Sequence, residues 1–130
     1  MLARIFGPGR DYSLLVLRLF LGVVFLVHGF LKLGNIGGFV GFLQQYGVPL
    51  PDIMAPLVAG IEFLGGIAII LGTLTRLAAL LLSGVMIVAM LTVTLKGSFA
   101  GGYDLNLVCL GGLLALLLAG PGKPAIGGDL

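Results

Sequence analysis

The sequence predicts an all-α fold, an integral membrane four-helix bundle with a short interfacial helix between the first and second spans. Of the 130 residues, 59% are hydrophobic and 9% are charged, whereas soluble domains carry about 25% charged residues. Four apolar stretches have roughly the 20-residue length that crosses the hydrocarbon of a bilayer. The chain length suits a single membrane domain over residues 1–130.

The first predicted span covers about residues 13–33. We interpret it as a retained helix and not a cleaved signal peptide, because the apolar run is too long and contains Arg18. Residues 38–46 follow, where aromatic side chains are mixed with glutamines. Aromatic residues favour the membrane boundary, so this segment predicts a short interfacial helix.

The remaining predicted spans cover about residues 53–72, 76–95 and 103–119. Pro56 falls near the start of the second span, where a missing N–H is tolerated. Only residues 73–75 connect the second and third spans. These two spans should therefore form an antiparallel hairpin.

The basic residues predict the orientation of the bundle. One side holds Arg4, Arg10, Arg76 and Lys123, and the other side holds Lys32 and Lys96. Positive charge favours the cytoplasmic side. Both termini are therefore predicted to be cytoplasmic.

Composition excludes several classes of function. The net charge is +2, but the basic residues are scattered and form no patch of the kind that binds nucleic acid. Cys109 is the only cysteine and His28 the only histidine. They are too few ligands for a tetrahedral metal site, and a lone cysteine in an apolar span predicts an inert buried thiol.

The charged residues of the first span share one helical face. Arg18, Gly22, Phe25, Gly29 and Lys32 follow the spacing i, i+4, i+7, i+11, i+14. His28 lies at the edge of this stripe. Small and charged residues on one face indicate that the face contacts protein and not lipid.

Glu62 is the only acid deep within a predicted span. Helix rise places His28 about 7 Å, Glu62 about 13 Å and Arg18 about 22 Å from the outer ends of their spans. Glu62 could therefore reach either Arg18 or His28. Asp104 and Asn106 enter from the outer side of the fourth span, and Arg76 at the cytoplasmic end can snorkel.

Small residues also recur in the fourth span, at Gly111, Ala115 and Ala119. Such spacing permits close helix packing. We expect it to serve packing within the bundle, with a subunit interface as the alternative.

Two interpretations of the polar residues stay open. In one, an ion-pair and hydrogen-bond network only fixes the register of the helices. In the other, the network lines an outward-opening pocket for a quinone-like head group and exchanges protons. On the second interpretation, the ligand-binding or proton-handling residues are Arg18, His28, Lys32, Glu62, Asp104 and Asn106.

These residues resemble the pattern of the DoxX family of small membrane proteins. The matching features cover roughly residues 18–122. They are Arg18, the Gly22…His28-Gly29…Lys32-Leu33 series, the interfacial region Phe39–Pro51 with its Gly-Val-Pro, residues 61–66, residues 71–76 and Gly120-Pro121-Gly122. The resemblance implies a four-helix protein of the bacterial inner membrane. It also implies a carboxylate near the outer end of helix four, the region of Asp104 and Asn106.

The named founder of that family is a subunit of a thiosulfate:quinone oxidoreductase, so the resemblance implies a subunit of, or accessory to, a quinone-linked redox complex. The chain would bind a quinone or similar lipophile, hold no covalent cofactor and work with a protein partner or as a homo-oligomer. No catalytic motif or redox centre is visible, so whether it is an enzyme stays open. The alternatives are an assembly protein without a ligand and a small oligomeric transporter.

Overall fold

The computed structural model describes residues 1, 4–5 and 10–127. Its main elements are α2 (Arg10–Leu33), α3 (Ile36–Gln45), α4 (Pro51–Leu71), α5 (Thr75–Thr92) and α6 (Asp104–Ala119), with two short turns, η1 (Thr94–Lys96) and η2 (Phe99–Tyr103), between the last two. This part of the chain contains no strand. Four helical stretches within it are long and apolar enough to cross a membrane. The predicted all-α membrane bundle is confirmed.

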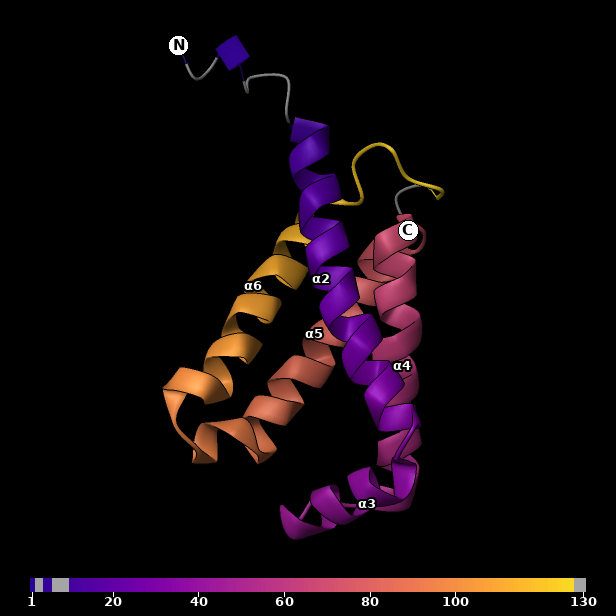
Figure 1. Ribbon diagram of the computed structural model, residues 1–130, viewed down its shortest axis with the longest axis vertical. Helices are drawn as coiled ribbons and strands as arrows, with labels where there is room; N and C mark the ends of the chain where they lie inside the picture. The colour runs from indigo at the N-terminus through magenta and orange to yellow at the C-terminus, as the bar shows by residue number, and fades with distance from the viewer. Residues whose placement is uncertain (2–3, 6–9, 128–130) are drawn as a thin grey trace.

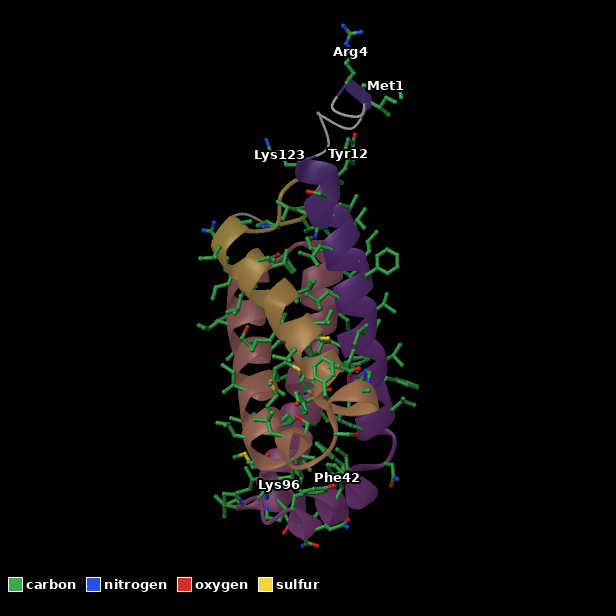
Figure 2. All side chains as sticks on the ribbon, turned by 90° about the vertical axis from the view of Figure 1, so that its left-hand side faces the viewer. Met1, Arg4, Tyr12, Phe42, Lys96 and Lys123 are labelled. Atoms are coloured by element: carbon green, nitrogen blue, oxygen red, sulfur yellow. The ribbon has the colours of Figure 1, made fainter. Side chains whose placement is uncertain are left out.

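The helices pack as two pairs with α3 crossing one end (Figure 1). α2 packs most extensively against α4, and α5 packs against α6. In Figure 1, the lower halves of α5 and α6 diverge from α2 and α4, and α3 lies at that same end. The opposite end carries both Met1 and Lys123 (Figure 2).

Local sequence explains where the helices begin and end. Asn35 caps α3, since its side chain accepts a hydrogen bond from the backbone N–H of Gly38. Gly72 ends α4 with a φ of 73°, a left-handed conformation that glycine adopts without strain. The chain then re-enters a helix at Thr75, as the hairpin prediction requires.

α5 ends at Thr92, whereas the predicted span ran to residue 95. Residues 92–94 are all β-branched, which disfavours the α-helix. Val93 leaves helical geometry, and the chain continues as the short turn η1.

The dense core lies toward the end that carries the termini. It joins Leu21 and Phe25 of α2 to Ile69 of α4 and to residues of α5 and α6. The buried residues of this core are Leu21, Phe25, Ile69, Ala78, Ala79, Leu82, Met86, Cys109, Leu113 and Leu116. None of these buried core residues belongs to α3.

The expected within-bundle packing of Gly111, Ala115 and Ala119 is wrong. All three are exposed, and a Cβ at Gly111 would meet no atom within 4 Å. The adjacent Gly112 faces the bundle instead, where a Cβ would lie 3.3 Å from a methyl group of Leu21. Successive residues are about 100° apart around a helix, so the two glycines face different surroundings.

Candidate functional site

A cavity of about 610 Å³ opens between the helices at the end that carries α3. It is lined by the C-terminal half of α2, the N-terminal half of α4, the C-terminal half of α5 and the N-terminal half of α6. Phe39, Phe42 and Leu43 of α3 also line it, together with residues 48, 93 and 94 between the helices. Ligand sites in proteins typically measure roughly 300–1,000 Å³ and are mainly apolar with a few polar groups, and this cavity fits that description.

An ion pair between Lys32 of α2 and Glu62 of α4 lies in the wall. The Lys32 ammonium donates to Glu62 Oε1 at 2.6 Å, and the carboxylate side chain is 2% exposed against 29% for lysine. The ammonium also lies 4.8 Å from the centre of the Phe39 ring. The pair therefore joins α2, α4 and α3 at the edge of the cavity.

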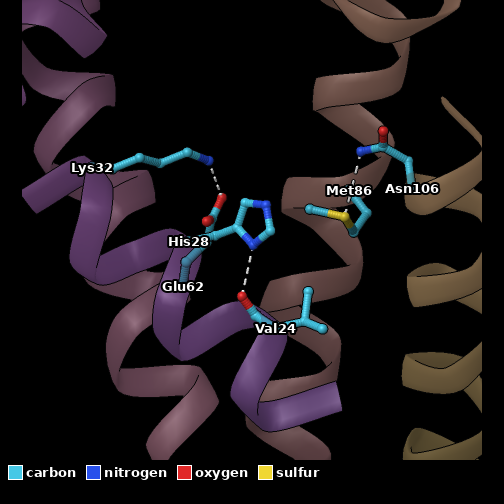
Figure 3. Close-up of polar contacts among 6 residues, drawn as sticks. All are labelled: Val24, His28, Lys32, Glu62, Met86 and Asn106. Carbon is cyan, nitrogen blue, oxygen red and sulfur yellow. Dashed lines mark hydrogen bonds and ion pairs between the residues drawn. The ribbon is translucent and has the colours of Figure 1, made fainter. Parts of the chain in front are cut away.

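His28 lies one turn before Lys32 on α2 and also lines the cavity. Its Nδ1 lies 2.7 Å from the carbonyl oxygen of Val24. In Figure 3, the ring projects from α2 toward the side of the cavity that carries Met86 and Asn106. His28 thus stands beside the ion pair and does not take part in it.

The opposite wall is formed by α5 and α6. Asn106 donates an amide hydrogen to the sulfur of Met86, with a nitrogen to sulfur distance of 3.5 Å. Cys109 lies one turn further along α6 and is 4% exposed. The predicted burial of this thiol is confirmed, although it also contributes to the cavity wall.

Arg18 lies outside the cavity, toward the end that carries the termini. Its guanidinium donates to the carbonyl oxygens of Ile69 and Ile70 at the end of α4 and of Pro121 and Pro124 in the C-terminal segment, at 2.7 to 3.1 Å.

Glu62 pairs with Lys32, and not with the two partners that helix depth had placed within reach, Arg18 and His28.

Asp104 and Arg76 also lie outside the cavity lining. Asp104 accepts hydrogen bonds from the backbone N–H groups of Gly101 and Leu105 and so stabilises the entry to α6. Arg76 donates to the carbonyl oxygen of Leu118 at 3.4 Å. Of the two polar residues at the start of α6, the structure brings only Asn106 to the cavity.

Residues 13–95 match the family model described as DoxX. The chain belongs to the DoxX family. The match includes all of α3, α4 and α5 and nearly all of α2, and therefore both members of the ion pair.

Curated relatives of this DoxX protein cover most of its length. The chain is 35% identical over 85% of its length to "Putative oxidoreductase CatD" of Bacillus subtilis (strain 168), covering 81% of that protein. It is 36% identical over 90% of its length to "Inner membrane protein YqjF" of Escherichia coli (strain K12), covering 91% of that protein. "Inner membrane protein YphA" of the same organism is 28% identical over 90% of the chain and 89% of the relative. No solved structure matches the chain.

The structure adds residues to the cavity of this DoxX protein that the sequence did not single out. The hydroxyl oxygen of Thr94 is buried and has no hydrogen-bond partner among the described residues, and Thr94 lines the cavity. Phe39 places its ring beside the ammonium of Lys32. Thr94 lies in the short turn η1 and Phe39 in α3. Neither side chain carries a charge or belongs to a recognisable motif, so the sequence did not distinguish them as cavity residues.

The resulting arrangement places the Lys32–Glu62 ion pair and His28 in a mainly apolar surround. A head group in the cavity would meet the Lys32–Glu62 pair and His28 on one side and Asn106 on the other. Within the described part of the chain, no group of three or more His, Cys, Asp and Glu is placed to hold a metal ion.

Proposed function

We propose that this DoxX protein binds a lipophilic small molecule of the quinone class in the cavity, as a subunit of or accessory to a membrane redox complex. The observation that carries the proposal is the Lys32–Glu62 pair beside His28 in the wall of an otherwise largely apolar cavity of about 610 Å³. Apolar walls suit a ring and tail, and the polar groups suit the oxygens of a head group.

The energetics of the ion pair support a ligand role. Charged groups within a membrane span are costly and usually serve a pathway or a binding site. Glu62 is 2% exposed and yet lines the cavity, so its carboxylate is held close to any head group that enters. The Lys32 ammonium gives one of its three hydrogens to Glu62 and would donate another to a quinone oxygen, and His28 would accept a proton near it.

The redox setting comes from a relative. The relative from Bacillus subtilis carries the name "Putative oxidoreductase CatD", and the chain aligns with 81% of that protein. A bound quinone would carry electrons and protons, and a protein partner would supply the other half of the reaction. We propose the bacterial inner membrane as the location, in line with the name of the relative "Inner membrane protein YqjF".

The first experiment is native mass spectrometry of the full chain released from mild detergent, followed by solvent extraction of what remains bound. A stoichiometric quinone or other small lipophile is the expected result. A protein partner or homo-oligomer that retains no small molecule would contradict the proposal and favour the assembly alternative.

The second experiment uses the variant Glu62→Gln and measures the binding of a short-tailed benzoquinone to the full chain in detergent. We expect about tenfold weaker binding or more, because the variant removes the counter-charge that holds the Lys32 ammonium at the cavity, and a hydrogen bond from that charged group to a quinone oxygen contributes about 1.5–3 kcal/mol. Asp104→Asn is the matched control, since this acid lies outside the cavity lining. Equal binding by a folded Glu62→Gln protein and by the control would reject the role of Glu62.

One observation favours an assembly protein without a ligand as the second candidate. The Lys32–Glu62 pair is made within the chain and joins α2 to α4, so it could act only as a lock between helices. In that case Glu62→Gln would lower thermal stability or recovery of a partner, with no ligand to lose.

A further inference from the structure

The hydrogen bond of His28 determines which ring nitrogen carries the hydrogen. Nδ1 lies 2.7 Å from the carbonyl oxygen of Val24. A carbonyl oxygen can only accept, so Nδ1 must be the donor. In the neutral imidazole, Nε2 then carries the lone pair and is an acceptor.

Nε2 of His28 has no hydrogen-bond partner within the described ranges 1, 4–5 and 10–127. His28 is exposed and lines the cavity. Lys32, one turn further along α2, is held by Glu62 and by the ring of Phe39. On the far wall, Asn106 directs its amide nitrogen toward the sulfur of Met86.

The cavity therefore offers an unpaired acceptor beside an ammonium group that is already paired. A ligand hydroxyl would donate to Nε2 and complete the hydrogen bonding of the ring. A ligand carbonyl or ether oxygen in the same place would face a lone pair and gain no hydrogen bond. An unpaired polar contact in an apolar surround carries a cost in binding free energy.

We infer that the cavity selects ring lipids whose head group donates a hydroxyl hydrogen, the phenol and hydroquinone class, over quinones and ethers of the same shape. His28 Nε2 is the acceptor. The inference rests on the proposed function, because it requires that a lipophilic ring enters the cavity, and it adds which chemical form the site prefers.

The test uses two redox-inert probes, a long-chain 4-alkylphenol and its methyl ether, titrated into the full chain in nanodiscs at neutral pH. The partition of each probe into empty nanodiscs is subtracted. We expect the phenol to bind about tenfold more tightly than the ether, the effect of one hydrogen bond of about 1.4 kcal/mol.

Two variants connect the preference to His28. His28→Leu keeps an apolar side chain of similar size and removes the acceptor, so the two probes should bind with equal affinity. His28→Gln offers a side-chain oxygen and should retain part of the preference. Because His28 is exposed, both variants should fold, and the thermal midpoint of each checks this.

The outcomes separate the two proposals. Equal binding of phenol and ether by the unaltered chain would overturn the preference and leave the proposed lipophile site intact. A preference that persists in His28→Leu would overturn the role of His28. If neither probe binds, the proposed site itself fails, and the inference fails with it.

Discussion

The side chain of Glu62 is 2% exposed near the middle of α4. Within the described residues its charge is paired with the ammonium group of Lys32. Removing a charge from water is expensive, and an ion pair offsets that expense only when both partners are present. Lys32 supplies the partner through a 2.6 Å hydrogen bond while its own side chain remains 29% exposed. Because Glu62 is much more buried than Lys32, the loss of either charge should change the stability of the protein by a different amount.

Lys32→Met should destabilise the protein, because it leaves the Glu62 carboxylate buried without its counter-charge. Breaking a fully buried pair costs about 3–5 kcal/mol. We expect a smaller loss of about 1–3 kcal/mol here, because the lysine is partly exposed and water screens the pair. Reversible unfolding of the protein in mixed micelles measures the change.

Lys32→Met combined with Glu62→Met provides the control. Replacing both charges with apolar groups removes the desolvation cost, so the double variant should recover most of the lost stability. A double variant that is less stable than Lys32→Met alone would show that the carboxylate has another stabilising partner.

The contact between α2 and α4 depends on glycines that let the two backbones approach. A Cβ at Gly29 would lie 2.3 Å from the backbone nitrogen of Phe63, and one at Gly66 would lie 2.5 Å from that of Leu26. Such distances are too short for any side chain. Close approach of small residues is how helices associate within lipid, and here it also brings Lys32 to Glu62.

Gly29→Ala should therefore push α2 and α4 apart. We expect a loss of about 1–3 kcal/mol in the free energy of unfolding, the usual cost of overpacking, since backbone cannot move aside as a flexible side chain can. Gly111→Ala is the matched control, because a Cβ there meets nothing within 4 Å. Equal stability of the two variants, measured by thermal unfolding in detergent, would contradict the close contact.

Arg18 joins parts of the molecule that are far apart in the sequence. Its guanidinium binds carbonyl oxygens at the end of α4, where a helix has unpaired acceptors, and in the segment that follows α6. The same segment donates backbone hydrogen bonds from Ile126 to Leu71 and from Gly127 to Gly72. The C-terminal segment is thus held against the end of the bundle.

Arg18→Lys should release this segment although it preserves the charge. A lysine ammonium lacks the planar fork that reaches several acceptors at once, so we expect a loss of about 2–4 kcal/mol in stability. Hydrogen exchange at the amides of Ile126 and Gly127 should become much faster. Arg76→Lys is the control, since Arg76 makes one long hydrogen bond of 3.4 Å within the described part of the chain. Unchanged exchange in Arg18→Lys would show that Arg18 does not hold the C-terminal segment.

The orientation of the whole molecule stays a prediction. Met1 and Lys123 lie at one end of the bundle and Lys96 at the other (Figure 2), and the excess of basic residues at the first end favours the cytoplasm. Lys96→Cys and Lys123→Cys, each in a Cys109→Ser background, report it. An impermeant maleimide should label Lys96→Cys in intact cells and Lys123→Cys only after permeabilisation, and the reverse pattern would overturn the assignment.

Particular residues show what the sequence alone determined. Long apolar runs predicted the four spans, because a bilayer requires length and hydrophobicity and both are local properties. The stripe of Arg18, Gly22, Gly29 and Lys32 indicated a face in contact with protein, and the close approach of both glycines to α4 confirms it. Periodicity gives the direction of a side chain around its own helix, which suffices for these conclusions.

The tertiary structure decided which charges meet and where the cavity lies. Helix depth left Arg18 and His28 as partners for Glu62, but the carbonyl groups at the end of α4 hold Arg18 and the long side chain of Lys32 reaches the carboxylate. It also separated Asn106, in the wall, from Asp104, outside it. These outcomes depend on how far one helix is shifted along another and how far the pairs diverge, which follows from packing over the whole bundle and not from any single stretch of sequence.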